Sequence, residues 1–246
     1  MKQALLRDTL KNSAPLFAAI AGINLIIFIH ELGHFLCARF FQLTIATFSL
    51  GFGPALYQKM INGTVFQIAL IPLGGYVELD PHQLSQQSYI AQMIILLGGI
   101  IFNILFAYII FAAYSFFEKR RLKQNENIES YRDSLKKFIK QEALDQSIIG
   151  PIGILAIISK IVSSYPHLYG LVLALLSINI ALINLLPVPF FDGGKVLLIT
   201  IEKITGYTIN PTLTWILSIL FLALIIFILI RATTHDISLF KQRNQS

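Results

Sequence analysis

Four long apolar runs stand out in the pattern of hydrophobic and polar positions along the chain, at residues 14–38, 91–117, 168–191 and 212–230. The last three contain no charged residue, and the first contains ionisable groups only from position 30 onward. About 20 apolar residues in a helix cross the roughly 30 Å of bilayer hydrocarbon. The pattern therefore predicts an α-helical polytopic membrane protein with about four transmembrane helices, built as a single domain over residues 1–246.

The segments between these runs differ in character. Residues 42–80 include "TIATFSLGFGP" and "TVFQIALIPLGGYVEL", which are rich in β-branched and aromatic residues, and Asn62-Gly63 between them is a hairpin signal. We therefore expect a small sheet or a pair of hairpins that dips into the bilayer surface. Residues 118–147 mix charges of both signs and predict a surface helix or a linker, whereas residues 150–165 predict a short interfacial or re-entrant helix.

Composition supports a membrane protein and argues against a nucleic-acid partner. Hydrophobic residues make up 55% of the chain, charged residues only 13%, and the mean hydropathy is +0.70. The net charge of +6 comes from basic residues between the apolar runs, as in the loops of membrane proteins. Cys37 is the single cysteine, so no intrachain disulfide can form.

The ionisable groups of the first run form a metal-binding pattern. "HELGH" at residues 30–34 places His30 and His34 one turn apart on one helix face, within reach of one Zn²⁺. Glu31 is adjacent and can act as a general base without binding the metal itself. The composition gives about 0.003 chance matches to this spacing. Buried ionisable groups in a membrane span are costly and usually functional.

A third ligand is expected because catalytic zinc usually takes three protein ligands. Acids are nearly absent from the other apolar runs, and Asp192 lies at the end of the third, in "NLLPVPFFDGG". The two prolines of this stretch must break the helix, and broken helices at membrane depth are tolerated where they line a site. We expect Gly193 and Gly194 to let the backbone turn tightly after the carboxylate. Asp192 is therefore the predicted third ligand, and a turn residue at a helix end is the alternative.

Several of these motifs together resemble the site-2 protease family of intramembrane zinc metalloproteases, and most closely the bacterial regulator-of-sigma-E type. They are "HELGH", "FSLGFGP", "IPLGGYV", "GPIG", "NLLPVPFFDGG" and "EKITG", and they cover nearly the whole chain. The resemblance implies a zinc endopeptidase in the lipid bilayer of the bacterial inner membrane. Its substrate would be a transmembrane segment of another protein.

The resemblance also implies roles for individual residues. His30, His34 and Asp192 would bind Zn²⁺, and Glu31 would be the general base. Asn184 would lie near the scissile bond, with Asn179 in the same polar stripe. The strand matching "VFQIALIPLGGYV" would pair with substrate, so that Ile68, Gly74 and Gly75 are candidate substrate contacts. We expect the stretch "TVFQIALI" to offer the free strand edge to an unwound substrate.

The chain departs from the family pattern in three places. Bacterial relatives of the closest type carry one or two PDZ domains between the second and third spans, whereas the 30 residues of Glu118–Ser147 are too few for one. Phe191 stands before the aspartate, where leucine is usual. Lys195 follows the two glycines, where close relatives often have histidine.

Two other function classes fit parts of the pattern. A catalytically inactive relative could bind membrane segments as an adaptor, although it would not need Glu31. A metal transporter could use His and Asp as transit ligands, but transporters favour internal repeats and several polar residues along a path. The chain has one compact polar cluster and no evident repeat, so both classes rank below the protease.

Charge and family resemblance predict opposite orientations in the membrane. The N-terminal segment, residues 118–166 and the C-terminal tail carry 15 of the 19 lysines and arginines. The positive-inside rule would place this side in the cytoplasm. The family resemblance implies the reverse, with the active-site end toward the cytoplasm, and this is the orientation that we expect.

Overall fold

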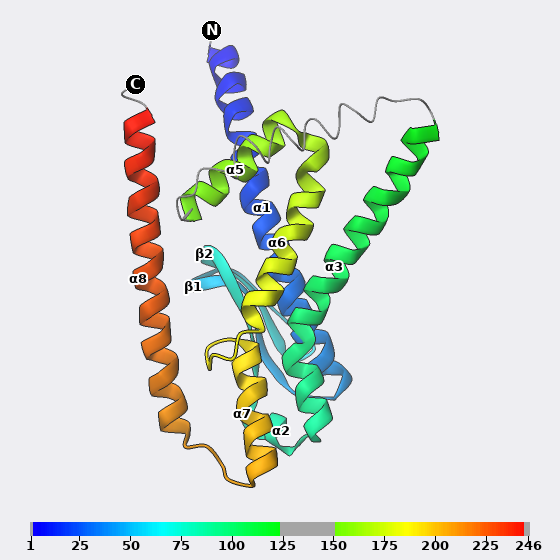
Figure 1. Cartoon of the computed structure of the whole chain (residues 1–246), viewed down its shortest axis with the longest axis vertical. Coiled ribbons are helices and arrows are strands. Elements are labelled where there is room, and N and C mark those ends of the chain that lie inside the picture. Colours follow the sequence, from blue (N-terminus) through cyan, green and yellow to red (C-terminus); the bar gives the residue numbers. More distant parts are fainter. Residues whose placement is uncertain (1, 124–150, 244–246) are drawn as a thin grey trace. The chain divides into compact units, whose positions relative to one another are not determined.

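The computed structural model describes residues 2–123 and 151–243, and the charged connection predicted at 118–147 falls largely outside them. Figure 1 shows the described elements in chain order. They are α1 (Lys2–Phe40), β1 (Ile45–Ile61), β2 (Thr64–Leu79), α2 (Pro81–Gln86), α3 (Tyr89–Lys123), α5 (Pro151–Ser164), the 3-10 turn η1 (Pro166–Leu168), α6 (Tyr169–Asn184), α7 (Asp192–Thr205) and α8 (Pro211–Arg243).

Four helices among the described residues are long and apolar enough to cross a membrane, which confirms the predicted number. These segments are Ser13–Phe40, Tyr89–Phe117, Pro166–Asn184 and Thr212–His235. The chain is an integral membrane protein. The short helix expected near residues 150–165 is present as α5, which has 14 residues.

A hairpin of β1 and β2 follows the first span. It turns at Asn62 and Gly63, whose φ angles of 49° and 81° are the positive values that a two-residue type I′ turn needs. Both strands are long and irregular in register, so residues 47–50 of β1 have partners in two parts of β2, namely 65–68 and 75–78. The predicted small sheet is confirmed.

This pairing corrects the expectation of a free edge along "TVFQIALI". Phe66 pairs with both Phe48 and Lys59, and Ile68 pairs with both Leu50 and Tyr57. Residues 65–68 therefore lie in the interior of the sheet, because the long β1 strand bends and flanks them twice. In the register, residues 75–78 each have one strand partner, so an edge lies there instead.

Aromatic side chains attach the hairpin to α1. The ring of Phe48 lies 5.9 Å from that of Phe28 and 5.6 Å from that of Phe35, in edge-to-face geometry. Phe66 adds a third strand contact, with its ring 5.5 Å from Phe35. Such pairs contribute about 0.5–1.5 kcal/mol each beyond their buried area. The hairpin therefore lies against the turns of α1 that carry "HELGH".

The third apolar run is divided into two helices. Helix α6 ends at Asn184, α7 begins at Asp192, and the two prolines lie in the non-helical stretch between them. The break is as predicted, although Asp192 starts a new helix and does not end the old one. The expectation that Gly193 and Gly194 supply a tight turn is wrong, because both lie within the first turn of α7.

Close packing explains these two glycines. A Cβ atom on Gly193 would collide with the backbone of Leu185, and one on Gly194 with the backbone of Val188. The missing side chains let the start of α7 lie directly against the non-helical stretch that precedes it. This contact determines where the Asp192 carboxylate is held.

The chain divides into two compact units. One comprises residues 1–21, 109–172 and 223–246, and within it the Tyr169 hydroxyl donates a hydrogen bond to the Ala18 carbonyl at 2.6 Å. The other comprises residues 22–108 and 173–222, which include the hairpin, α2 and α7. All the candidate site residues belong to this second unit.

Candidate active site

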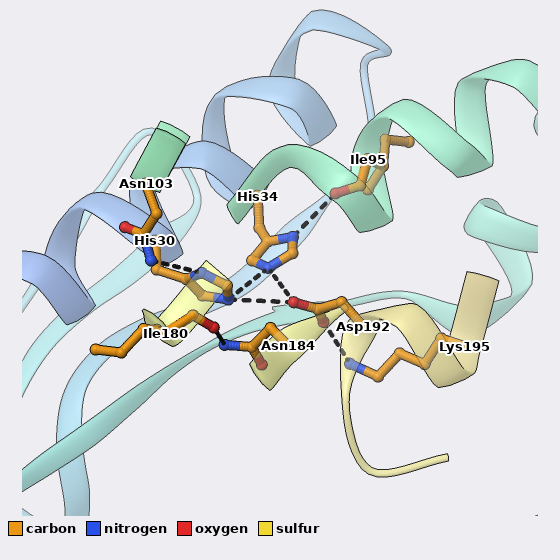
Figure 2. Close-up of polar contacts among 8 residues, drawn as sticks. All are labelled: His30, His34, Ile95, Asn103, Ile180, Asn184, Asp192 and Lys195. Carbon is orange, nitrogen blue, oxygen red and sulfur yellow. Dashed lines mark hydrogen bonds and ion pairs between the residues drawn. The ribbon is translucent and has the colours of Figure 1, made fainter. Parts of the chain in front are cut away.

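His30, His34 and Asp192 form one compact, buried group, and their exposed fractions are 7%, 8% and 6%. The two histidines face the same way because they are one turn apart on α1 (Figure 2). Asp192 Oδ2 lies 3.1 Å from the Nε2 atom of each histidine, and the two Nε2 atoms are 3.2 Å apart. The fold therefore brings Asp192 to the two histidines from 158 and 162 residues away in the chain.

These separations fit a tetrahedral metal ion. Ligand atoms about 2.0–2.1 Å from a tetrahedral zinc are about 3.3 Å from one another, close to the distances between the three atoms here. Two imidazole nitrogens and one carboxylate oxygen form a donor set that zinc accepts, with a fourth position left for water. The residues present therefore fit Zn²⁺.

Gly99 on α3 provides the space that such an ion needs. A Cβ atom there would lie 2.5 Å from His34 Nε2 and 2.6 Å from His30 Nε2. Any side chain at this position would therefore press on the ligand atoms themselves. The sequence reasoning did not identify Gly99, since one glycine in an apolar helix carries no signal of its own.

Glu31 lies beside this group without belonging to it. It follows His30 on α1 and is half-buried, and its carboxylate is not among the atoms that converge on one point. The Glu31 side chain lies against the hairpin, where a Cβ atom on Gly75 would be 3.0 Å from Glu31 Cγ. Gly75 also lies close to β1, since the same Cβ atom would be 2.8 Å from the Ser49 carbonyl oxygen. A carboxylate next to the metal ligands but free of them suits a general base.

The second oxygen of Asp192 has a different partner. Lys195, one turn further along α7, donates a hydrogen bond from Nζ to Asp192 Oδ1 at 3.3 Å (Figure 2). Burial by itself would raise the pKa of Asp192, but the hydrogen bonds to His30 and His34 and the charge of Lys195 outweigh it. They hold that pKa well below its usual range. Asp192 is therefore an anionic carboxylate with one oxygen directed at the histidines.

Helix α3 contacts the far nitrogen of each histidine. His34 Nδ1 donates to the Ile95 carbonyl at 2.9 Å, and His30 Nδ1 lies 3.3 Å from Asn103 Nδ2 (Figure 2). The backbone carbonyl of Asn103 accepts a hydrogen bond from the Ser177 hydroxyl of α6 at 2.9 Å. Sequence reasoning missed Asn103 and Ser177. The feature that could have identified each of them is a polar side chain within an apolar, uncharged span.

The predicted substrate residues lie around the site in different ways. Asn184 is half-buried and its amide donates to the Ile180 carbonyl at 3.0 Å, within its own helix (Figure 2). Asn179 is exposed and donates to the Leu175 carbonyl at 3.0 Å in the same manner. Gly75 touches Glu31, whereas Ile68 lies in the interior of the sheet with an exposed side chain.

The other histidines and the cysteine lie outside the group. The side chains expected to be surface residues, His82, His167 and His235, are exposed. Cys37 packs against the hydrophobic cluster formed by Ala38, Leu43, Ile45 and Ile95. Among the described residues, the candidate metal group contains only the two histidines of "HELGH" and Asp192.

Comparison with known proteins points to one family. The model of peptidase family M50 matches residues 18–228 of the chain. A protein of Rickettsia conorii (strain ATCC VR-613 / Malish 7), named "Putative zinc metalloprotease RC0203", is 26% identical over 346 aligned positions, which cover 89% of this chain and 97% of the relative. That alignment is 100 positions longer than the 246 residues here, so the relative contains segments without a counterpart in this chain.

Shorter matches agree with this one. A Fusobacterium nucleatum subsp. nucleatum protein with the same description is 34% identical over 100 positions, which cover 37% of this chain and 30% of the relative. A Helicobacter pylori (strain J99) protein, again so described, is 38% identical over 108 positions, covering 38% of this chain and 31% of the relative. The matched region spans less than a third of each of these two relatives.

Proposed function

The chain belongs to peptidase family M50 and is a zinc metalloprotease, and on that premise we propose that it cleaves a transmembrane segment of another membrane protein. The observation that carries this proposal is the position of the metal group: His30 and His34 lie inside the candidate membrane span Ser13–Phe40. A protease whose ligands lie in such a helix acts on substrates at membrane depth. We further propose that the membrane is the bacterial inner membrane.

In the proposed reaction the protein residues bind the ion and move protons. His30, His34 and Asp192 would hold Zn²⁺, which when bound supplies Lewis acidity that makes water a nucleophile near neutral pH. Glu31 accepts the proton of the attacking water as the oxygen bonds to the peptide carbonyl carbon. It then donates that proton to the leaving amine as the C–N bond breaks. Glu31 thus ends each cycle ionised, ready for the next water.

Asn184 is the proposed stabiliser of the oxyanion that develops on the peptide carbonyl. Its half-buried amide lies at the end of α6, next to the break that precedes Asp192. An amide that donates only to its own helix, as here to Ile180, can turn toward a substrate oxygen at little cost. Removing one such donor from a hydrolase typically lowers kcat about 10²–10³-fold.

A transmembrane substrate must also unwind before it can be cut. Unpaired backbone groups in lipid cost several kcal/mol each, so the enzyme has to replace the helical hydrogen bonds. We propose that the substrate adds as a strand to the edge at residues 75–78, and not to the interior residues 65–68. The contact between Gly75 and Glu31 supports this choice, because a peptide paired there would run beside the general base.

The substitution Glu31→Gln tests the proposal. Purified Glu31→Gln protein should retain about one zinc per chain but lose cleavage of a model transmembrane substrate, because the amide cannot accept a proton. His34→Ala should lose both tight zinc and cleavage. Glu202→Gln, near the end of α7, is the matched control and should retain both, because its amide oxygen can still accept the hydrogen bond from the Ile209 N–H.

Two outcomes would contradict the proposal. Cleavage by Glu31→Gln at a rate comparable to that of the unmodified protein would remove Glu31 as the base. The adaptor function would be favoured by two results together. The unmodified, zinc-loaded protein would bind the substrate segment without cleaving it, and Glu31→Gln would bind the segment equally well.

A further inference from the structure

Three residues of α3 face the two histidines along one stripe of the helix. Ile95, Gly99 and Asn103 are each four residues apart, so their side chains or carbonyls lie above one another. Ile95 contacts His34, Asn103 contacts His30, and Gly99 leaves space beside both Nε2 atoms. Gly33 and Gly98 permit this closeness, because a Cβ atom on Gly98 would lie only 2.7 Å from the Gly33 carbonyl oxygen.

Asn103 is the unusual member of the stripe. Its exposed fraction is 0%, and within the described part of the chain its Oδ1 atom has no hydrogen-bond partner. Leaving a buried acceptor unsatisfied costs about 1–3 kcal/mol. A helix that needed only packing at this position could use an apolar residue at no such cost. The amide is therefore expected to make an interaction that repays its burial.

The orientation of this amide is coupled to the proton of His30. With Nδ2 donating to His30 Nδ1, the proton of the neutral imidazole must sit on Nε2, the nitrogen that faces Asp192 and His34. Rotating the amide by 180° about its last bond exchanges Nδ2 and Oδ1 without moving any other atom. Oδ1 then accepts a hydrogen bond from Nδ1–H, and the Nε2 lone pair is free for a metal ion.

We propose that Asn103 is a positioning residue for the metal centre, and that its Oδ1 atom holds His30 in the tautomer that binds zinc through Nε2. It does for His30 what the Ile95 carbonyl does for His34. The proposal rests on the proposed assignment of His30, His34 and Asp192 as zinc ligands. Partners of this kind orient metal-binding imidazoles and raise their basicity, and their loss typically costs about 10–100-fold in metal affinity.

A purely structural Asn103 would behave differently under substitution. Its amide would then serve to join helices, in the way that its backbone carbonyl accepts from Ser177. In that case any replacement that alters packing or adds charge would be harmful, whether or not it can accept a hydrogen bond. An acceptor for Nδ1–H, by contrast, can be replaced by another acceptor but not by an apolar side chain of similar size.

The test compares Asn103→Leu with Asn103→Asp in the full-length protein in detergent, with zinc affinity measured by competition against a chromogenic chelator. Leu keeps most of the volume but removes the acceptor, so zinc should bind about 10–100-fold more weakly. Asp keeps an acceptor oxygen, so zinc should bind at least as tightly as in the unmodified protein. Ser177→Ala removes the hydrogen bond to the Asn103 backbone and should leave zinc affinity unchanged. If Asn103→Leu does not accumulate, Asn103→Ala replaces it, because alanine also removes the acceptor oxygen.

A second measurement reads the tautomer directly. In protein labelled with ¹⁵N-histidine, the His30 nitrogen resonances should shift toward the Nε2–H form in Asn103→Leu and toward the Nδ1–H form in Asn103→Asp. Unchanged zinc affinity in both the Leu and Ala variants would overturn the proposal, as would equal losses in Leu and Asp. His34→Ala separates the two claims. If it loses zinc while Asn103→Leu does not, only the Asn103 proposal fails, and if it retains zinc, the ligand assignment fails and the Asn103 proposal with it.

Discussion

At the scale of single residues, the site depends as much on a missing side chain as on the ligands. The Nε2 atoms of His30 and His34 are 3.2 Å apart, and the point where a Gly99 Cβ would lie is 2.5–2.6 Å from both. A methyl group there would compete with the metal ion for the same space. Rearrangement is restricted because α1 and α3 already touch at Gly33 and Gly98.

Gly99→Ala should therefore reduce zinc affinity by more than the roughly 10–100-fold typical of losing an outer hydrogen bond to a metal ligand. Zinc content after dialysis against a chelator, measured by mass spectrometry, checks this expectation. Gly170→Ala is the matched control, because a Cβ atom at that helical glycine makes an ordinary 3.7 Å contact with Ile110. Normal zinc content in Gly99→Ala would show that the helices can separate enough to admit a methyl group.

Lys195, one of the departures from the family pattern, should have a small effect on zinc affinity. Its ammonium group lies 3.3 Å from Asp192 Oδ1, but half of its side chain is exposed, so solvent screens the pair. Such pairs contribute up to about 1 kcal/mol, which corresponds to a change of less than about fivefold in zinc affinity. Lys195→Met should lower affinity within that range and Lys203→Met, on the same helix, should not. A loss much larger than fivefold would mean that Lys195 fixes the carboxylate more rigidly than the distance indicates.

At the scale of elements, the hairpin has a strand edge that begins beside Glu31, the proposed general base. Residues 65–68 are paired on both sides, while residues 75–78 have one strand partner each. Gly75 begins this edge and touches Glu31. Residues 57–61 of β1 also have one strand partner each, but the edge at residues 75–78 is the one that lies beside Glu31.

Proline substitutions separate the edge from the interior. In an antiparallel strand successive N–H groups point to opposite sides, so Tyr76→Pro and Val77→Pro should differ. The variant that removes the outward N–H should lose substrate cleavage with normal protein levels, and the other should lose stability by about 1–3 kcal/mol. Ile68→Pro should only destabilise, since both sides of that residue are paired.

The alanine variants at positions 68, 76 and 77 are the controls, because they keep the N–H donor and should be milder throughout. Cleavage activity and the midpoint of thermal unfolding are measured in parallel. Full activity of both the Tyr76 and the Val77 proline variants, at normal protein levels, would exclude strand addition at this edge.

At the scale of the whole molecule, the chain lacks segments that its relative in Rickettsia conorii carries, at least 100 aligned positions in all. Four spans would place 15 of the 19 basic residues on one side of the membrane, together with the N-terminal segment and the C-terminal tail.

The orientation that we expect places the loop between α7 and α8 in the cytoplasm, against the positive-inside rule. Single cysteines at Thr208, in that loop, and at Gln124, outside the described residues, are introduced after Cys37→Ala. A membrane-impermeant thiol reagent added to intact cells should label position 124 and not position 208. The opposite labelling would show that the charge distribution determines the orientation.

The sequence by itself determined the features that neighbouring residues encode. Run lengths predicted the four spans, Asn62-Gly63 predicted the hairpin turn, and the i, i+4 spacing of His30 and His34 placed both on one helix face. Pro187 and Pro189 predicted the break between α6 and α7. Each of these depends on local geometry, which a short window of sequence specifies.

Only the tertiary structure decided which distant groups meet. His30 contacts Asn103 over 73 residues and Asp192 over 162, and no local period links such positions. The same holds for Gly99, whose importance arises from two side chains on another helix, and for the sheet edge, which depends on how β1 bends around β2. Packing between helices and strands determines these contacts, because side chains from different parts of the chain must share one buried volume.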